Sequence, residues 1–199
     1  MSEPHEPQDV ADRPREAAFD SRQLRHAFGK FATGVTVVTC RTPDGTPHGA
    51  TVNAFTAVSL DPPLAQVTLI RGNKASTYLE DQPFAINILA EHQLRTCLNF
   101  AGKPMQPGPR WRSDDGVPVL EGNAATLECR PWATYDGGDH VIVIGEVIEL
   151  EVHDRDPLLF VSGKFRELGD YTGGSPWSMS GDGPASGWFE GSTDFKSFA

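Results

Sequence analysis

The sequence has 199 residues, of which 38% are hydrophobic, and it carries a formal net charge of −10 at pH 7. This length suits one domain with a sizeable core, while the lack of a basic stripe argues against nucleic acid or an anionic membrane as a partner. No apolar run approaches the ~20 residues of a membrane span, and the N-terminus lacks the apolar segment of a secretory signal.

The first predicted elements are a disordered stretch, a helix and a strand. Residues 1–18 are rich in Pro, Glu, Asp and Arg, which predicts disorder. Asp20 or Ser21 can cap a short helix. The apolar residues that share one face of this helix by their i, i+3, i+4, i+7 spacing are Leu24, Ala27, Phe28 and Phe31. Residues 35–40 (VTVVTC) predict a buried strand, and the turn signal at 42–45 predicts its hairpin with residues 50–59.

The stretch 51–63 (TVNAFTAVSLDPP) is the most informative part of the chain. Its alternation predicts a strand in which Val52 and Ala54 share one face and Asn53 lies on the other, and the prolines at its end stop it. A strand built only to fill a core carries more Val, Ile or Leu, so the small polar residues favour a flat ligand lying against the backbone. A solvated edge strand is the alternative.

The rest of the chain predicts further strands with short helices at the corners. Strands are predicted at residues 64–70, 84–89, 126–135, 141–152 and 158–161, with a helical turn near 76–80 and a helix over 91–100. The Pro- and Gly-rich residues 101–118 predict a long surface loop. The tail from residue 169 is expected to be disordered or laid over a neighbouring surface. Together these elements predict a mainly β fold, an antiparallel barrel of about six strands that is closed or partly closed.

Several familiar catalytic motifs are absent from the sequence. No G-x-G-x-x-G follows a strand, no P-loop occurs, and the six histidines show no metal-ligand spacing. Cys40, Cys97 and Cys129 are far apart, which favours free thiols in a reducing cytoplasm. What remains is a ligand held largely by backbone groups. Flavin enzymes fit that profile, because their cofactor carries the chemistry.

Four segments stand out together: residues 31–39 (FATGVTVVT), 51–63, 76–77 with 84–89 (FAINIL), and 138–140 (GDH) with 145–147 (GEV). In this order they resemble the short-chain flavin reductases of two-component monooxygenase systems, which have the FMN-binding split-barrel fold. The resemblance covers about residues 20–168. It implies a six-stranded antiparallel split barrel of Greek-key type over residues 19–168, flanked by an acidic N-terminus (1–18) and a Gly/Ser-rich tail (169–199).

The resemblance also implies a flavin, FMN or FAD, in a groove between the barrel and the second subunit of a homodimer. The implied flavin-lining residues, acting mostly through backbone groups, are Thr33, Gly34, Val35, Thr36, Val37, Val52, Asn53, Ala54, Phe55, Thr56, Ala57, Val58 and Ser59. Asn53 would bond the ring edge, and Ser59 the ribityl–phosphate end. Lys74, Ser76 and Thr77 would hold the phosphate. The alternatives are an ordinary helix cap for Ser76 and a solvated charge for Lys74.

His140 follows the glycine-containing turn at residues 136–139, which can bring a side chain close to a ligand. A lone histidine beside a turn is usually structural or exposed, whereas the GDH resemblance implies that His140 binds and orients the nicotinamide of NADH or NADPH. Phe165 is implied as a wall of the same pocket, with plain core packing as the alternative. No residue is assigned a role in proton transfer.

The implied function is an NAD(P)H:flavin oxidoreductase that reduces FMN or FAD by hydride transfer and supplies diffusible reduced flavin to a partner monooxygenase. The protein would help chiefly by holding the two rings at near-contact distance. The alternatives are a flavin-retaining enzyme like pyridoxamine-phosphate oxidase, which usually offers the phosphate more cations than Arg71 and Lys74, and a non-catalytic flavin-binding module. The choices of flavin and dinucleotide stay open, although Arg110 and Arg112 could serve a phosphate.

Overall fold

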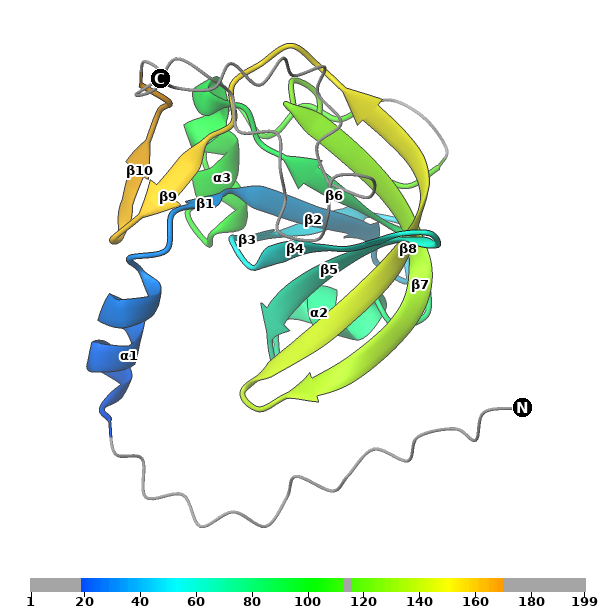
Figure 1. The fold of residues 1–199 in the computed structure, drawn as a ribbon. Coiled ribbons are helices and arrows are strands. Elements are labelled where there is room, and N and C mark those ends of the chain that lie inside the picture. Colours follow the sequence, from blue (N-terminus) through cyan, green and yellow to red (C-terminus); the bar gives the residue numbers. More distant parts are fainter. Residues whose placement is uncertain (1–18, 113–115, 170–199) are drawn as a thin grey trace, which may run out of the picture. The chain divides into compact units, whose positions relative to one another are not determined.

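The computed structural model describes residues 19–112 and 116–169, so the predictions for residues 1–18 and 170–199 lie outside the described residues. In chain order its elements (Figure 1) are α1 (Ser21–Phe28), β1 (Thr33–Gly34), β2 (Thr36–Arg41), β3 (Pro47–Val52), β4 (Phe55–Leu60), β5 (Pro63–Ile70), α2 (Lys74–Tyr78), β6 (Phe84–Ile88), the 3₁₀ helix η1 (Glu91–Gln93), α3 (Leu94–Phe100), β7 (Ala125–Gly137), β8 (His140–Val152), β9 (Leu159–Val161) and β10 (Lys164–Arg166). One compact unit ends at Glu167. In the described ranges no helix is both long and apolar enough to cross a membrane.

The predicted mainly β, antiparallel fold is confirmed. The larger sheet has seven strands in the order β3-β2-β6-β7-β8-β5-β4, and the smaller has the order β1-β9-β10. Every strand pair is antiparallel. The consecutive strands β6, β7 and β8 lie side by side and β5 returns next to β8, which is a Greek-key arrangement. The described residues form ten strands where about six were expected. The short strand predicted at 158–161 is β9, but the stretch predicted as one strand over 50–59 forms β3 and β4, and β1 and β10 are too short to show an alternating pattern.

The larger sheet curls around one hydrophobic core. Six of its strands contribute buried side chains to this core. Helix α2, which packs against β2, β3 and β5, adds Ala75, and Leu79 directly after the helix is also part of the core. Gly145 of β8 is needed here, because a Cβ on it would lie 2.6 Å from the Phe84 ring and 2.8 Å from the Cys129 Cβ. A second core packs α3 and β9 against β2, around Val37 and other residues.

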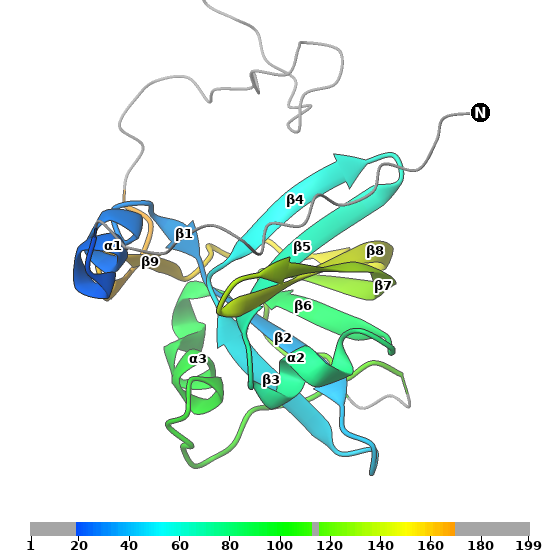
Figure 2. The same cartoon turned by 90° about the horizontal axis from the view of Figure 1, so that it is seen from below.

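The single strand expected over residues 50–59 is wrong: the chain forms two strands there. β3 pairs with β2 and β4 pairs with β5, and the chain bends at Asn53 and Ala54 between them. The Ala54 carbonyl accepts a hydrogen bond from Thr68 N at 3.0 Å. Because the two halves pair with different partners, the alternation does not run through the bend, and the hairpin expected with residues 35–40 involves β3 alone. Figure 2 shows β4 and β5 extending away from β3.

A buried polar network fixes the segment between α3 and β7. The Asn87 amide of β6 is fully buried and donates to Val37 O and to Thr39 Oγ1, both at 2.9 Å. Its Oδ1 accepts from Leu120 N at 3.0 Å and from Asn123 Nδ2 at 2.9 Å. All four hydrogen-bonding positions of this amide are therefore satisfied inside the protein.

Candidate functional site

The split in the barrel lies between β3 and β4, which follow each other in the chain but form opposite edges of the seven-stranded sheet. An edge strand leaves one row of backbone N–H and C=O groups unpaired. Among the residues predicted to line the ligand, those exposed along this edge are Asn53, Ala54, Thr56, Ala57 and Val58. Val52, Phe55 and Ser59 are half-buried. The β4 edge thus combines free backbone groups with small exposed side chains, the surface that a flat ligand needs.

Residues 33–37 approach the same bend from β1 and β2. Thr36 pairs with Val52 in the β2–β3 register, so the residues before Thr36 lie at the end of the hairpin that leads into Asn53. Thr36 and its two neighbours, Val35 and Val37, are buried at 2% exposure or less. Their side chains are therefore covered by the protein. Of the residues from 33 to 37, only Thr33, which is half-buried, and Gly34, which is exposed, are open to a ligand.

Two observations at β1 fit contact with a bound ligand. The hydroxyl Oγ1 of Thr33 is buried and has no hydrogen-bond partner within the described residues. No heavy atom lies within 4 Å of the position that a Cβ of Gly34 would take, so there is open space beside it. Buried hydroxyls normally have a partner, and a bound group would supply one here. The free edge, the small side chains and the unpaired hydroxyl fit the flavin that the resemblance implies.

The three residues predicted to hold the phosphate lie on α2, which packs against β2, β3 and β5. Asn73 caps this helix by accepting from Ala75 N at 2.9 Å. Ser76 is 6% exposed and its hydroxyl donates to Asn73 O at 2.7 Å, the arrangement expected of a structural residue in a first helical turn. Lys74 and Thr77 are exposed and open to a ligand. Lys74 also lies near His48, since its charge adds to burial in lowering the pKa of that histidine.

His140 lies where β8 begins, directly after the tight turn between β7 and β8. Gly138 has a φ of +78°, a conformation that favours glycine. The His140 Nδ1 lies 2.6 Å from Asp139 Oδ1, and this hydrogen bond together with the imidazole charge lowers the pKa of Asp139. Nε2 has no hydrogen-bond partner within the described part of the chain. The carboxylate therefore holds one ring nitrogen and leaves the other for a ligand.

Arg71, which the sequence analysis noted only as a cation, fixes this turn from the end of β5. Its Nε donates to Gly138 O at 2.8 Å, and its Nη2 lies 2.9 Å from Asp136 Oδ1. Its backbone N–H donates to Asp139 O at 2.9 Å. Asp136, Gly138 and Asp139, which precede β8, thus share one small hydrogen-bonded unit with Arg71, which follows β5. The position of His140, the first residue of β8, depends on this unit.

Phe165 lies in β10, whereas the sequence analysis placed it after the last strand. Its ring packs against Phe160 with centroids 5.1 Å apart, and both residues border the second core. Phe160 in turn pairs with Thr33 across the small sheet. Phe165 is therefore connected to Thr33, at one end of the site, through the strands of the small sheet. The packing of Phe165 against Phe160 agrees with the alternative that Phe165 has a core role.

Two polar residues beside the site were missed by the sequence analysis. Gln66 and Thr68 are half-buried on β5, where Gln66 pairs with Thr56 of β4. Their side chains lie 3.4 Å apart, Gln66 Nε2 donating to Thr68 Oγ1. The sequence feature that could have revealed them is the alternation of residues 64–70. Ala65, Val67 and Leu69 are buried, and the polar residues between them lie on the other face of the strand.

Comparison with known proteins gives a consistent result. The family model described as "Flavin reductase like domain" matches residues 28–169. The FMN reductase (NADH) SmoA of Agrobacterium fabrum is 42% identical over 149 residues, which cover 73% of this chain and 85% of SmoA. The flavin-dependent monooxygenase reductase subunit HsaB of Rhodococcus jostii is 36% identical, covering 80% of this chain and 85% of HsaB. The solved structure of the Streptomyces globisporus NADH:FAD oxidoreductase SgcE6, in complex with NAD and FAD fragments, is 35% identical with a TM-score of 0.71 and covers 77% of this chain and 96% of its own.

Proposed function

The chain belongs to the flavin reductase-like domain family, and we propose that it is an NAD(P)H-dependent flavin reductase. It takes a hydride from NADH or NADPH, reduces FMN or FAD, and supplies the reduced flavin to a partner monooxygenase. Its relatives include an NADH-dependent FMN reductase and a reductase subunit of a flavin-dependent monooxygenase. The catalytic domain spans residues 19–168.

The observation that carries this proposal is the β4 edge at the split of the barrel. The free backbone groups of residues 53–59 would bond the polar edge of the flavin ring, and Ala54 and Ala57 would let the ring approach closely. Thr33 would donate its unpaired hydroxyl from the other side. Lys74 and Thr77 would meet the phosphate, with Ser76 supporting their helix. The flavin itself supplies the redox chemistry.

The proposed role of His140 is to bind and orient the nicotinamide. Asp139 holds Nδ1 at 2.6 Å, so the imidazole keeps one orientation and presents Nε2 outward. Arg71 keeps the turn in place through its bonds to Gly138 and Asp136. Phe165 would line the nicotinamide pocket only at the end near Thr33. No side chain is needed for proton transfer, because holding two rings at near-contact distance supplies most of the help that a protein can give.

The proposal includes a homodimer in a reducing cytoplasm. Ile148, Leu150 and Val152 lie on one face of β8 and are 51%, 65% and 69% exposed. An apolar stripe of this kind on a described sheet face is costly in water and would be covered by a second copy of the chain. The three cysteines are all free and buried, which agrees with a reducing compartment.

The test is to mix the purified protein with NADH or NADPH and each of FMN, FAD and riboflavin, and to follow the loss of nicotinamide absorbance. Oxidation that requires added flavin and rises with its concentration supports a reductase that releases its product. Tightly bound flavin that neither dinucleotide reduces would instead indicate a flavin-binding module. Reduction of a permanently bound flavin, with no response to added flavin, would indicate a flavin-retaining enzyme.

A further inference from the structure

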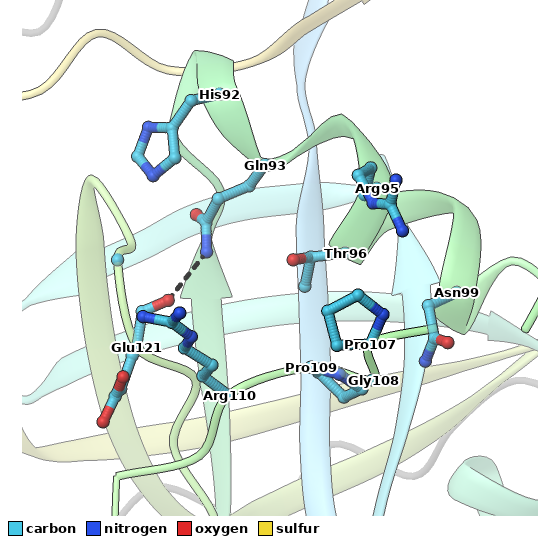
Figure 3. Close-up of a pocket in the computed structure, with 11 residues that line it drawn as sticks. His92, Gln93, Arg95, Thr96, Asn99, Pro107, Gly108, Pro109, Arg110 and Glu121 are labelled. Atoms are coloured by element: carbon cyan, nitrogen blue, oxygen red, sulfur yellow. Dashed lines mark hydrogen bonds between the residues drawn. The ribbon is translucent and has the colours of Figure 1, made fainter. Parts of the chain in front are cut away.

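A hollow of about 490 Å³ lies between the helical segment η1–α3 and the loop at residues 107–110. Figure 3 shows His92, Arg95, Thr96 and Asn99 on one side of it and the loop with Arg110 on another. None of the residues predicted to bind flavin or nicotinamide lines it. Sites for small molecules are typically of this size.

The walls of this hollow are fixed by hydrogen bonds. Gln93 is 5% exposed, and its Nε2 donates to Glu121 O at 2.9 Å and to Asn123 Oδ1 at 3.3 Å. Arg95 Nη2 donates to Gln106 O at 2.5 Å, which ties the loop to α3. Through Asn123 the wall joins the fully buried Asn87 network. The hollow therefore exists before any ligand arrives, which lowers the entropy cost of binding.

The groups that line the hollow are those that bind an anion. Arg110 makes no side-chain hydrogen bond or ion pair within the described residues, and Arg95 uses only one of its donors, on Gln106. The His92 ring lies beside Gly122, because a Cβ added to Gly122 would lie only 3.3 Å from the Nε2 atom of His92. Arg95, Arg110 and His92 all line the hollow, and guanidinium and imidazole groups around one space suit a phosphate, to which arginine donates in a bidentate fork.

The other lining groups suit a sugar attached to that phosphate. The exposed Glu121 carboxylate would repel a bare anion but can accept hydrogen bonds from ribose hydroxyls, and the Thr96 hydroxyl can do the same. Pro107 and Pro109 give an apolar wall against which a sugar or base can pack. We propose that this hollow binds the ribose-phosphate part of a nucleotide, at a site separate from the split between β3 and β4.

The test is calorimetric titration of the full chain with AMP, adenosine and inorganic phosphate. We expect AMP to bind at least tenfold more tightly than adenosine or phosphate. Arg110→Gln should weaken AMP binding about tenfold, the loss expected for one charge-assisted hydrogen bond. Arg22→Gln, an equal charge change on α1, should leave it within twofold. Arg110→Gln is the informative variant because the side chain has no described partner whose loss could unfold the protein.

Three results would overturn the proposal: no AMP binding at millimolar concentration, equal affinities of the Arg110→Gln and Arg22→Gln variants, or equal affinities for AMP and phosphate. A comparison of the affinities for adenosine 2′-phosphate and AMP identifies which cofactor the hollow would bind. Preference for the 2′-phosphate supports a site for NADPH, and preference for AMP supports one for NADH or FAD. Because AMP binding is measured without flavin or nicotinamide, it can fail while the reductase activity proposed above is present, and the reverse, so the two failures are distinguishable.

Discussion

Replacing Asn87 with alanine should destabilise the protein strongly, although the residue lies in the core and touches no proposed substrate. The change removes four hydrogen bonds of 2.9–3.0 Å from a fully buried amide. Asn123 Nδ2 keeps two other acceptors, Leu120 O and Thr126 Oγ1. The buried N–H of Leu120 loses the partner it has in the structure, Asn87 Oδ1, and cannot reach water.

The magnitude follows from these losses. A buried donor left without a partner costs ~1–3 kcal/mol, and the space left by the amide adds to this cost. We expect Asn87→Ala to lower the free energy of unfolding by about 3 kcal/mol. For a chain of this length that corresponds to a fall in Tm of roughly 6–12 °C.

The assay is thermal and urea unfolding followed by circular dichroism, with Thr126→Val as the matched control. Thr126→Val keeps the shape of the side chain and removes only one of three acceptors of Asn123 Nδ2, so we expect a loss of about 1 kcal/mol. Amide exchange at Leu120 should also accelerate in Asn87→Ala. If Asn87→Ala loses no more stability than Thr126→Val, the network does not anchor this segment and the reasoning fails.

The remaining predictions concern the site and the thiols. Ala57→Leu should raise the Kd for flavin at least tenfold in a fluorescence titration. The control Ala101→Leu changes an exposed residue after α3 and should leave this Kd unchanged. Normal flavin affinity in Ala57→Leu would contradict the proposed groove. His140→Ala should raise the KM for NADH and leave flavin affinity within twofold, and unchanged NADH kinetics would refute its role. Burial raises the pKa of each of the three cysteines to about 11 or 12, so at pH 8 they are protonated and should resist a thiol reagent until the protein unfolds. Rapid labelling of the native protein at pH 8 would show that the thiols are not buried.

Local signals in the sequence were sufficient for several elements. Asp20 was proposed as a helix cap, and its carboxylate accepts from Gln23 N at 2.7 Å while the Gln23 side chain accepts from Asp20 N, forming a capping box. The two prolines after Leu60 were expected to end the strand, and β4 ends at Leu60. Such signals act over a few residues, so the sequence carries them directly.

Features that depend on distant partners could not be predicted in the same way. The bend at Asn53 separates β3 from β4 because each pairs with a different strand, and the alternation of residues 51–59 holds no trace of that choice. In the sequence, Asn87 is one polar residue in an apolar strand. Its hydrogen-bond network could not be predicted, because its partners Leu120 and Asn123 lie 33 and 36 residues away. The Arg71 clamp on Gly138 likewise spans 67 residues.

Hydrogen–deuterium exchange of the protein with and without saturating FMN tests the proposed flavin site most directly. The proposed site lies at the split between β3 and β4, where the outer amides of β4 have no described partner strand. We therefore expect slower exchange in residues 33–34 and 53–60 on adding FMN, with little change in α1. Slower exchange confined to other segments, such as α3 and the loop at 107–110, would contradict it.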